Sequence, residues 1–376
     1  MNEIRPRLSP GAKWEILIEK VRQVTPDAAI KLLDGEGADL GPQFFIEKDK
    51  EIRRQKSKYK ELFSRYNHLL NDYEELDKMF SDSLLIEKNI SPLPVSVKFP
   101  EEDHEATAIA IFSYWHCGDV VRKEQVHGMN EYNPSVAKRR ADTLAINFIK
   151  LVEKERKSIP ITNAVIHLGG DFIGGFIHPE LEQTNSMTPV QETQFASELL
   201  ISSLDYILKC GNFERLILLM SVGNHGRITK KMQFANLTET SYETLIYDNI
   251  AKAFRNDDRV EINFPESGVG YQEVYGKTIR FLHGHQYKFG GGIGGISVPI
   301  NRMQMRLDKS RQAYLNLMGH FHNFGTPNNN TIMNGSLKGW EAFSAEKGFE
   351  YQPAVQAFCL LDSKYGRTIT CPIFCD

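Results

Sequence analysis

The stretch LILLMSVGNH, residues 216–225, decides the fold: an apolar run ends at Gly223 and continues into Asn224 and His225. A short apolar run of this kind is typical of a buried strand in an α/β protein. Such a strand delivers the polar side chains that follow it to the carboxyl edge of a sheet, where α/β proteins usually place their chemistry. Taken alone, the stretch leaves open whether His225 is a hydrogen-bonded core residue or part of a site.

Four other apolar runs end in the same way. They are residues 108–113 before His116, 164–168 before Asp171, 278–282 before His283, and 314–318 before His320 and His322. Glycine adjoins most of these polar residues, and it permits a sharp turn and a close backbone approach to a bound group. Five strands that end in His, Asp or Asn predict one shared site.

The chemistry of these side chains favours a metal. Imidazole nitrogen, amide oxygen and carboxylate oxygen suit Mn, Fe, Zn, Ni or Co, and the absence of cysteine from the set argues against a closed structural zinc site. Alternate residues of an extended strand share a face, so His320 and His322 can both point into one site.

The order of these motifs resembles that of the calcineurin-like metallophosphoesterases, whose series is Asp-x-His, Gly-Asp, Gly-Asn-His, His and Gly-His-x-His. The resemblance covers residues 105–376. The stretches YWHCGD, GGDFIGG and GNHGR are most similar to the phage-encoded, nuclease-like branch. The resemblance implies an α/β fold in which two mixed β-sheets are sandwiched between helices.

The resemblance also implies two divalent metal ions, with manganese expected and iron, zinc, nickel or cobalt as alternatives. By this resemblance, the ligands would be His116 and His322 for the first ion and Asn224, His283 and His320 for the second. Asp171 would bridge the two ions. His225 would be the acid or the electrostatic stabiliser near the leaving oxygen. Two ions about 3.5 Å apart can ionise a bridging water and clamp both oxygens of an in-line displacement at phosphorus.

Tyr114 departs from the family pattern, which has Asp at this position. A phenol has a pKa near 10 against about 4 for Asp, so it offers no ready anion unless a metal removes its proton. Three interpretations are open: Tyr114 is a ligand, it inactivates the site and leaves the fold intact, or Asp119 supplies the carboxylate. An impaired first site is favoured, because a five-residue shift along the chain would not reproduce the Asp geometry.

Four further residues are candidates for substrate binding, and each is also explained as an ordinary surface residue. Arg227 stands where the family usually has an acid and can donate two hydrogen bonds to a phosphate. His178 lies in the loop after Asp171. Arg302 and Arg306 lie on an expected helix and can follow a phosphate backbone. The preceding glycine run, residues 290–295, matches the letters of a dinucleotide fingerprint but lacks its βαβ unit, so we expect a loop beside the metal site instead.

The composition is that of an ordinary globular protein, with 41% hydrophobic and 25% charged residues among 376. A formal net charge of −3 means that any nucleic-acid-binding surface must be local. The five cysteines form neither a zinc pattern nor a disulfide framework, which favours a reducing compartment. No apolar run has the length of a membrane span or a signal peptide. We expect a cytoplasmic protein without membrane contact, in the host cytoplasm if it is phage-encoded.

The chain divides into three expected parts. Residues 1–40 form a small helical segment, either a helix-turn-helix that reaches DNA or a helical pair that packs on the main domain. Residues 41–95 hold a long heptad-patterned helix and a linker, and residues 96–376 form the metallophosphoesterase domain.

The heptad pattern occupies residues 47–80. Apolar or aromatic residues recur every seven positions, at Ile52, Tyr59, Tyr66, Tyr73 and Phe80, with Leu62, Leu69 and Leu76 at the matching second positions. The helix should pair with a second copy in a homodimer, with another helix of its own chain, or with the catalytic domain.

In the main domain we expect helices over 133–157, 190–210 and 240–256 between the strands. The later strands, around 259–283 and 355–373, indicate a second sheet. Together the features predict a metal-dependent phosphodiesterase that acts on nucleic acid, with DNA as the expected substrate. The alternatives are a phosphodiesterase for small or cyclic nucleotides, and a non-catalytic scaffold that binds DNA or a partner.

Overall fold

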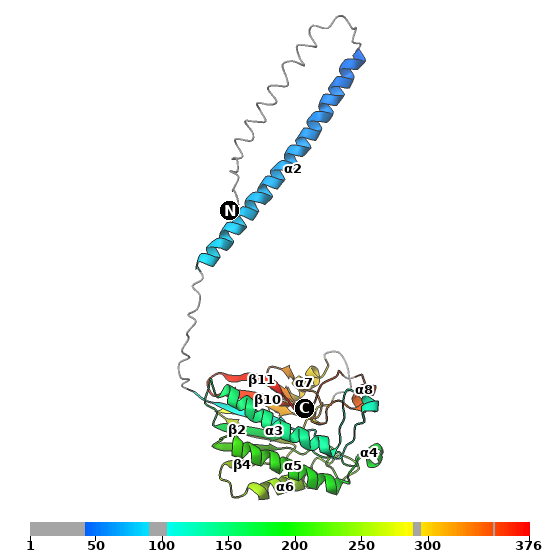
Figure 1. Ribbon diagram of the computed structural model, residues 1–376, viewed down its shortest axis with the longest axis vertical. Coiled ribbons are helices and arrows are strands. Elements are labelled where there is room, and N and C mark those ends of the chain that lie inside the picture. The colour runs from blue at the N-terminus through cyan, green and yellow to red at the C-terminus, as the bar shows by residue number, and fades with distance from the viewer. Residues whose placement is uncertain (1–41, 90–103, 289–294, 349) are drawn as a thin grey trace, which may run out of the picture. The chain divides into compact units, whose positions relative to one another are not determined.

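The computed structural model describes residues 42–89, 104–288, 295–348 and 350–376 (Figure 1). The chain separates into two compact units, Met1–Val97 and Lys98–Asp376. Each unit is considered by itself. The expected helical segment 1–40 and all but the last residue of the glycine run 290–295 lie outside the described residues.

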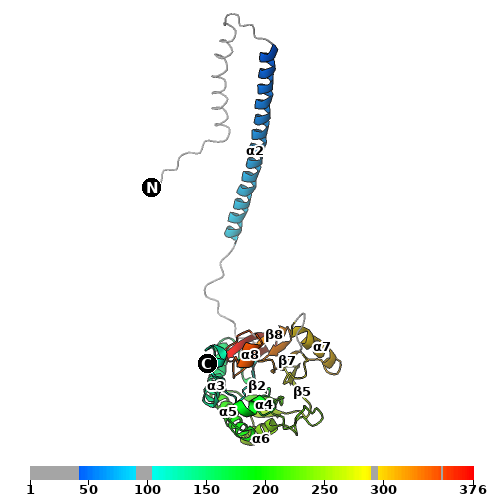
Figure 2. The same ribbon diagram turned by 90° about the vertical axis from the view of Figure 1, so that its right-hand side faces the viewer.

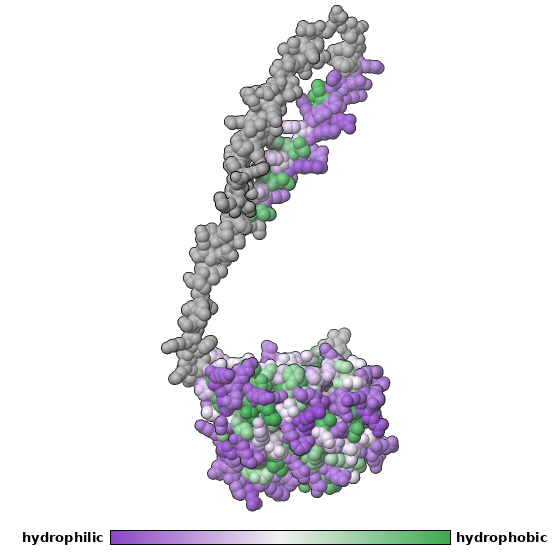
Figure 3. All heavy atoms as spheres, viewed as in Figure 1, coloured by the Kyte–Doolittle hydropathy of each residue, from purple (hydrophilic) through white to green (hydrophobic). Residues whose placement is uncertain are grey.

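The first unit contains one long helix, α2 (Pro42–Asn89), which includes the heptad-patterned stretch. Ion pairs between residues four apart, such as Arg65 with Glu61, support it along its polar side. The heptad stripe consists of Ile52, Tyr59, Leu62, Tyr66, Leu69, Tyr73 and Leu76, and these side chains are 45% to 73% exposed. Figure 3 shows such apolar residues interspersed among polar ones along α2. The helix is confirmed, and its pairing stays a prediction.

The second unit contains a six-stranded sheet in the order β11-β10-β1-β2-β3-β4. Its strands are β1 (Ala106–Phe112), β2 (Asn163–Leu168), β3 (Arg215–Met220), β4 (Val260–Asn263), β10 (Val355–Asp362) and β11 (Gly366–Phe374). Strands β1 to β4 are parallel, whereas β10 pairs antiparallel with β1 and with β11. Because β1 to β3 are parallel, their carboxyl ends lie at the same edge of the sheet.

A second, five-stranded sheet has the order β5-β6-β7-β9-β8. It is built from β5 (Val269–Val274), β6 (Lys277–Leu282), β7 (Leu315–Met318), β8 (Gly325–Asn328) and β9 (Thr331–Met333). The expectation that residues 355–373 belong to this sheet is wrong. Those residues form β10 and β11, which extend the first sheet because β1 offers a free edge for antiparallel pairing. Likewise β4, the first strand of the 259–283 stretch, joins the first sheet.

Helices connect and cover the strands. They are the 3-10 helix η1 (Lys123–Val126) and the α-helices α3 (Pro134–Glu155), α4 (Pro179–Thr184), α5 (Pro189–Cys210), α6 (Tyr242–Phe254), α7 (Ser297–Leu307) and α8 (Ala342–Glu346). The three long helices begin at side-chain caps: Asn133, Thr188 and Ser241 each accept a backbone N–H of the first turn. The helices expected over 133–157, 190–210 and 240–256 are therefore confirmed.

The side chains of the central strands alternate between two cores. From β1, Ala108, Ala110 and Phe112 pack under the helical layer of α3, α5 and α6. Ile109 and Ile111 point the other way and pack against the second sheet. Figure 2 shows α3, α5 and α6 on one side and α7 on the other. Two mixed sheets thus lie between helices, which confirms the fold class.

None of the helices within the described ranges combines the length and the apolar composition needed to cross a membrane.

Phe148 is a test of the core beneath α3. Its ring is fully buried and packs against Phe213 and Phe358. We expect Phe148→Ala to lower the free energy of unfolding by about 3–5 kcal/mol, because it leaves a cavity between the helix and the sheet. Urea denaturation monitored by circular dichroism measures this loss. Ile146→Ala, on the exposed side of the same helix, is the matched control and should cost less than about 1 kcal/mol; equal losses would contradict the packing.

Candidate metal centre

The backbone at the strand ends adopts a conformation that non-glycine residues rarely take. Five candidate residues have positive φ: Tyr114 (56°), His116 (46°), Asp171 (57°), His320 (69°) and His322 (61°). The loops hold one another in place, since the Asp171 carbonyl accepts hydrogen bonds from the backbone N–H of Trp115 at 2.9 Å and of His116 at 3.1 Å. Strained positions of this kind cluster at functional sites.

Two glycines allow the loops after β2 and β3 to meet. A Cβ at Gly170 would lie 2.3 Å from the backbone nitrogen of Gly223, and one at Gly223 would lie 2.1 Å from Oδ1 of Asp171. Only residues without a side chain permit this approach. The glycines of the Gly-Asp and Gly-Asn-His motifs therefore bring Asp171 up against residues 223–225.

Four of the predicted residues converge, and we call them the His283 group: Asp171, Asn224, His283 and His320. His283 Nδ1 lies 2.6 Å from the carbonyl oxygen of Gly169 and donates to it in the neutral ring. The other nitrogen, Nε2, is then bare. It lies 3.1 Å from Asn224 Oδ1, 3.1 Å from Asp171 Oδ2 and 3.3 Å from His320 Nδ1.

This convergence of lone pairs fits a divalent cation. Asp171 Oδ2 is buried and makes no hydrogen bond within the described part of the chain, although His283 is near. Burial would lower the pKa of His283, but the Asp171 carboxylate outweighs it and the pKa is raised. Burial and the neighbouring His283 lower the pKa of His320 to about 4. When His283 is protonated, the added proton lies on Nε2 and faces Asp171, and a metal ion would take the place of that proton.

A second set, the His116 group, consists of His116, Asp171 and His225, whose ligand atoms lie within 4.8 Å of one another. His116 Nδ1 is 3.0 Å from Asp119 Oδ2, and its buried Nε2 has no partner among the described residues. His225 Nδ1 is 2.8 Å from the carbonyl oxygen of Gly174, so its other nitrogen faces the pocket. Burial and His116 lower the pKa of His225 to about 4, so its ring is neutral at pH 7.

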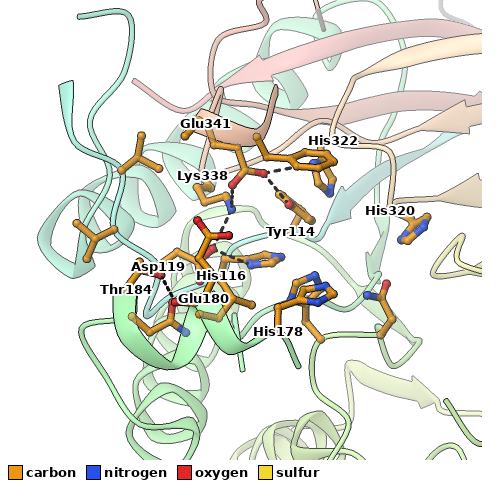
Figure 4. A pocket seen from close by; sticks show the side chains of 18 of the residues that line it. Tyr114, His116, Asp119, His178, Glu180, Thr184, His320, His322, Lys338 and Glu341 are labelled. Carbon is orange, nitrogen blue, oxygen red and sulfur yellow. Dashed lines mark hydrogen bonds and ion pairs between the residues drawn. The ribbon is translucent and has the colours of Figure 1, made fainter. Parts of the chain in front are cut away.

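Tyr114 lies between two of the predicted ligands of the first ion. Its ring centroid is 4.1 Å from that of His116 and 3.3 Å from that of His322 (Figure 4). The hydroxyl donates to Glu341 Oε1 at 3.0 Å. Burial, together with the charge of Glu341, raises the pKa of Tyr114, so the phenol keeps its proton. The structure therefore brings His322 next to Tyr114 and Glu341, outside both groups.

Lys338 and Glu341 complete the wall of the pocket, and sequence reasoning missed them. The ammonium of Lys338, a residue that is 2% exposed, lies 2.8 Å from Asp119 Oδ2 and also bonds Glu341 Oε2. It stands 5.1 Å from the Tyr114 ring centroid. Asp119 thus orients His116 and pairs with Lys338. Neither Lys338 nor Glu341 belongs to a motif, and nothing in the sequence indicates a buried lysine at position 338.

Two buried glutamates, also missed, hold the motif loops from behind. Glu243 accepts the backbone N–H of Phe172 at 2.7 Å and of Gly223 at 2.6 Å. Glu192 accepts the backbone N–H groups of Gly118, Gly174 and Gly175. Each carboxylate ties loops from different strands together. Their positions in α6 and α5 look like ordinary polar positions of an amphipathic helix.

The four residues predicted to contact substrate lie in different places. A pocket of about 980 Å³ opens over the centre, and His178 lines it with its ring 6.2 Å from that of His225. Arg227 donates to the carbonyl oxygen of Asn224 at 2.6 Å and so supports the motif loop. Arg302 and Arg306 are exposed on α7 and are not among the residues that line this pocket.

Comparisons with known proteins found no matching family model and no matching curated protein. Among solved structures, vacuolar protein sorting 29 from Cryptosporidium parvum aligns with 71% of this chain and 97% of its own length. The sequence identity is 12% and the TM-score is 0.29. The structure of a hypothetical protein from Pyrococcus horikoshii OT3 aligns with 72% of this chain and 89% of its own length. The sequence identity is 13% and the TM-score is 0.35. A Thermus thermophilus sulfate thiohydrolase, SoxB, aligns with 73% of this chain and 58% of its own length. The sequence identity is 11% and the TM-score is 0.31. At these scores no property of these proteins is transferred to the chain.

Glu243→Gln tests the buried carboxylate behind the site in metal-free protein. Burial, followed by the charge of Asp171, raises the pKa of Glu243 from 4.5 to about 7. The folded chain therefore holds this proton more tightly than the unfolded chain, so the stabilisation is fully present below pH 4.5 and is lost as the pH rises through 7. We expect the stability of the wild type to fall relative to that of Glu243→Gln over this interval, by up to about 1.4 kcal/mol per pH unit.

Urea denaturation in EDTA at several pH values measures this difference. The exposed Glu198→Gln, on α5, serves as the control and should show no such trend. A difference between Glu243→Gln and wild type that does not change with pH would contradict the raised pKa.

Proposed function

We propose that the protein is a metal-dependent phosphodiesterase that hydrolyses phosphodiester bonds in nucleic acid. The convergence of the His283 group carries the proposal, because Asn224 Oδ1, Asp171 Oδ2 and His320 Nδ1 all lie within 3.3 Å of His283 Nε2, and Asp171 Oδ2 is buried without a hydrogen bond among the described residues. A divalent ion bound there supplies a Lewis acid and lowers the pKa of a bound water. Manganese remains the expected metal, with iron, zinc, nickel or cobalt as alternatives, and the resemblance implies two ions.

The chain's own residues position and protonate the substrate. The Gly174 carbonyl fixes the His225 ring with its free nitrogen towards the pocket. An anionic phosphodiester next to this nitrogen would raise the pKa of His225, because a negative charge favours the protonated ring. His225 would then hold the proton that the leaving oxygen requires. His116, oriented by Asp119, would offer its unpartnered Nε2 to the same region.

The pocket favours a narrow substrate. Its volume of about 980 Å³ is in the range of pockets that enclose one small ligand. Its lining includes the carboxylates of Asp119, Glu180 and Glu341, and its lysine is paired with two of them. A single-stranded end therefore fits this entrance better than a duplex does.

Two observations support other candidates. The size of the pocket also suits small or cyclic nucleotides, which need no basic track for a phosphate backbone. The protonated Tyr114 between His116 and His322 supports a non-catalytic scaffold that binds DNA or a partner. Activity measurements separate these candidates.

The test is manganese-dependent cleavage of single-stranded DNA, double-stranded DNA, cyclic nucleotides and bis(p-nitrophenyl) phosphate. We expect EDTA to abolish hydrolysis, added Mn²⁺ to restore it, and single-stranded DNA to be cleaved faster than duplex. Asp171→Asn should lower the rate on the order of 100-fold or more, because it removes the charge that holds the metal. Gel and absorbance assays follow the two kinds of substrate.

His127→Asn is the matched control, since this exposed histidine has a positive φ that Asn also accepts. It should keep the wild-type rate. If only small nucleotides are cleaved, the substrate is a small or cyclic nucleotide and not nucleic acid. If the protein cleaves none of these substrates but still binds DNA, the non-catalytic scaffold is the remaining candidate.

We also propose that α2 pairs with α2 of a second copy through the heptad stripe, as a homodimer. The seven described residues of the stripe leave a large apolar area in water on an isolated helix. Their seven-residue spacing is the pattern by which two helices bury such a stripe against each other.

Leu62→Glu with Leu69→Glu tests this pairing. The two charges would lie in the seam and repel their copies, so we expect the dimer to dissociate at micromolar protein concentration. Sedimentation equilibrium measures the mass. Asn71→Glu, at an exposed position of the same helix outside the stripe, should leave the mass unchanged; a monomeric wild type would refute the proposal.

A further inference from the structure

We infer that the centre binds one divalent ion rather than two: the His283 group takes the ion, and Tyr114 with the Lys338–Glu341 pair closes the position of the other. The inference rests on the proposed metal-dependent function and changes its cofactor count. It also explains how the pocket wall remains stable without the second ion.

Charge is the first argument. Across both groups, Asp171 is the one carboxylate among the described residues. The His283 group uses its Oδ2, and Oδ1 already accepts the backbone N–H of His225 at 2.9 Å. A second ion in the His116 group would be left with two neutral histidines and a share of one negative charge. Carboxylate, carbonyl and water oxygens are the ligands that suit Mn²⁺, and this set offers it only the shared carboxylate.

Space is the second argument. The Tyr114 ring lies between His116 and His322 (Figure 4), and its centroid is only 3.3 Å from that of the His322 ring. These two histidines are the ones that the family pattern assigns to the first ion. An aromatic ring between them presents carbon where a ligand oxygen is required. The hydroxyl, which could in principle bind a metal, is directed at Glu341 and donates to it.

The fixed cation of Lys338 is the third argument. Asp119 Oδ2 accepts from both His116 and Lys338, so the ammonium is two hydrogen bonds away from the His116 ring. The ammonium occupies carboxylate oxygens of Asp119 and Glu341 that a second dication would otherwise need as ligands. At the same time it neutralises Asp119 and part of Glu341, which would otherwise be buried carboxylates with no counter-charge.

The backbone of residue 338 is also held in place. The backbone carbonyl of Lys338 accepts hydrogen bonds from Asn130 at 2.9 Å and from Arg140 at 2.7 Å. Arg140 in turn bonds Asn130 and the carbonyl of Leu337. Residue 338 therefore cannot swing out of the wall without breaking a buried network.

The experiment counts ions on the full chain. Wild type is stripped with EDTA and titrated with Mn²⁺ by isothermal titration calorimetry, and electron paramagnetic resonance is recorded on the loaded protein. We expect one Mn²⁺ per chain and the spectrum of an isolated ion. Two ions per chain with an exchange-coupled spectrum would overturn the inference and leave the proposed function standing. No bound ion would overturn the proposed function itself.

Variants identify what closes the position. Tyr114→Asp supplies a carboxylate and removes the ring, and Tyr114→Asp with Lys338→Met also removes the cation. We expect a second Mn²⁺ and a coupled spectrum in at least the double variant, with circular dichroism confirming the fold of each. Tyr114→Phe is the matched control and should bind one ion, because the ring remains. A double variant that folds and still binds one ion would overturn the assignment of Tyr114 and Lys338 as the closing residues.

Discussion

Asp171 places a charged carboxylate in the interior at the end of β2, and the surrounding loops compensate that charge from several sides. Its Oδ1 accepts a backbone N–H from the loop after β3, and its Oδ2 faces a histidine from β6. Nearby His283 and His225 hold the pKa of Asp171 well below its usual range despite burial, which acts in the opposite direction. A buried charge is tolerated only when it is paired in this way. The two sheets therefore meet at a point where each contributes part of the compensation.

The same principle explains the wall on the other side of the pocket. The buried Asp119 and Lys338 and the partly buried Glu341 are three charges that no single pair would satisfy, and together they form one connected set with His116 and Tyr114. Glu192 and Glu243 hold the loops by accepting backbone N–H groups instead of cations. The site is thus surrounded by carboxylates whose partners are specified individually. Such an arrangement gives the loops little freedom, which is consistent with the strained φ values that they maintain.

How far the sequence leads can be judged from particular residues. The strand before Gly223 follows from its apolar run, and the positions of Asp171 and His283 follow from motifs at strand ends. The assignment of 355–373 to the second sheet failed because edge pairing is a choice between two free edges that local pattern does not encode. Lys338 and Glu341 were missed because a lysine is buried only when distant residues supply its partners. Arg302 and Arg306 are not among the residues that line the pocket, because nearness in sequence to a motif does not place a side chain there.

The left-handed backbone at residue 114 has a separate consequence. Tyr114 has φ of 56°, a region that short polar residues such as Asp and Asn enter far more readily than bulky ones. The loop geometry at this position is therefore suited to the aspartate that the motif would contain, and it persists with a side chain that disfavours it. The conformational strain of this residue, of order 1–3 kcal/mol, is carried by the rest of the fold. In thermodynamic terms, the side chain at position 114 lowers the stability of the domain.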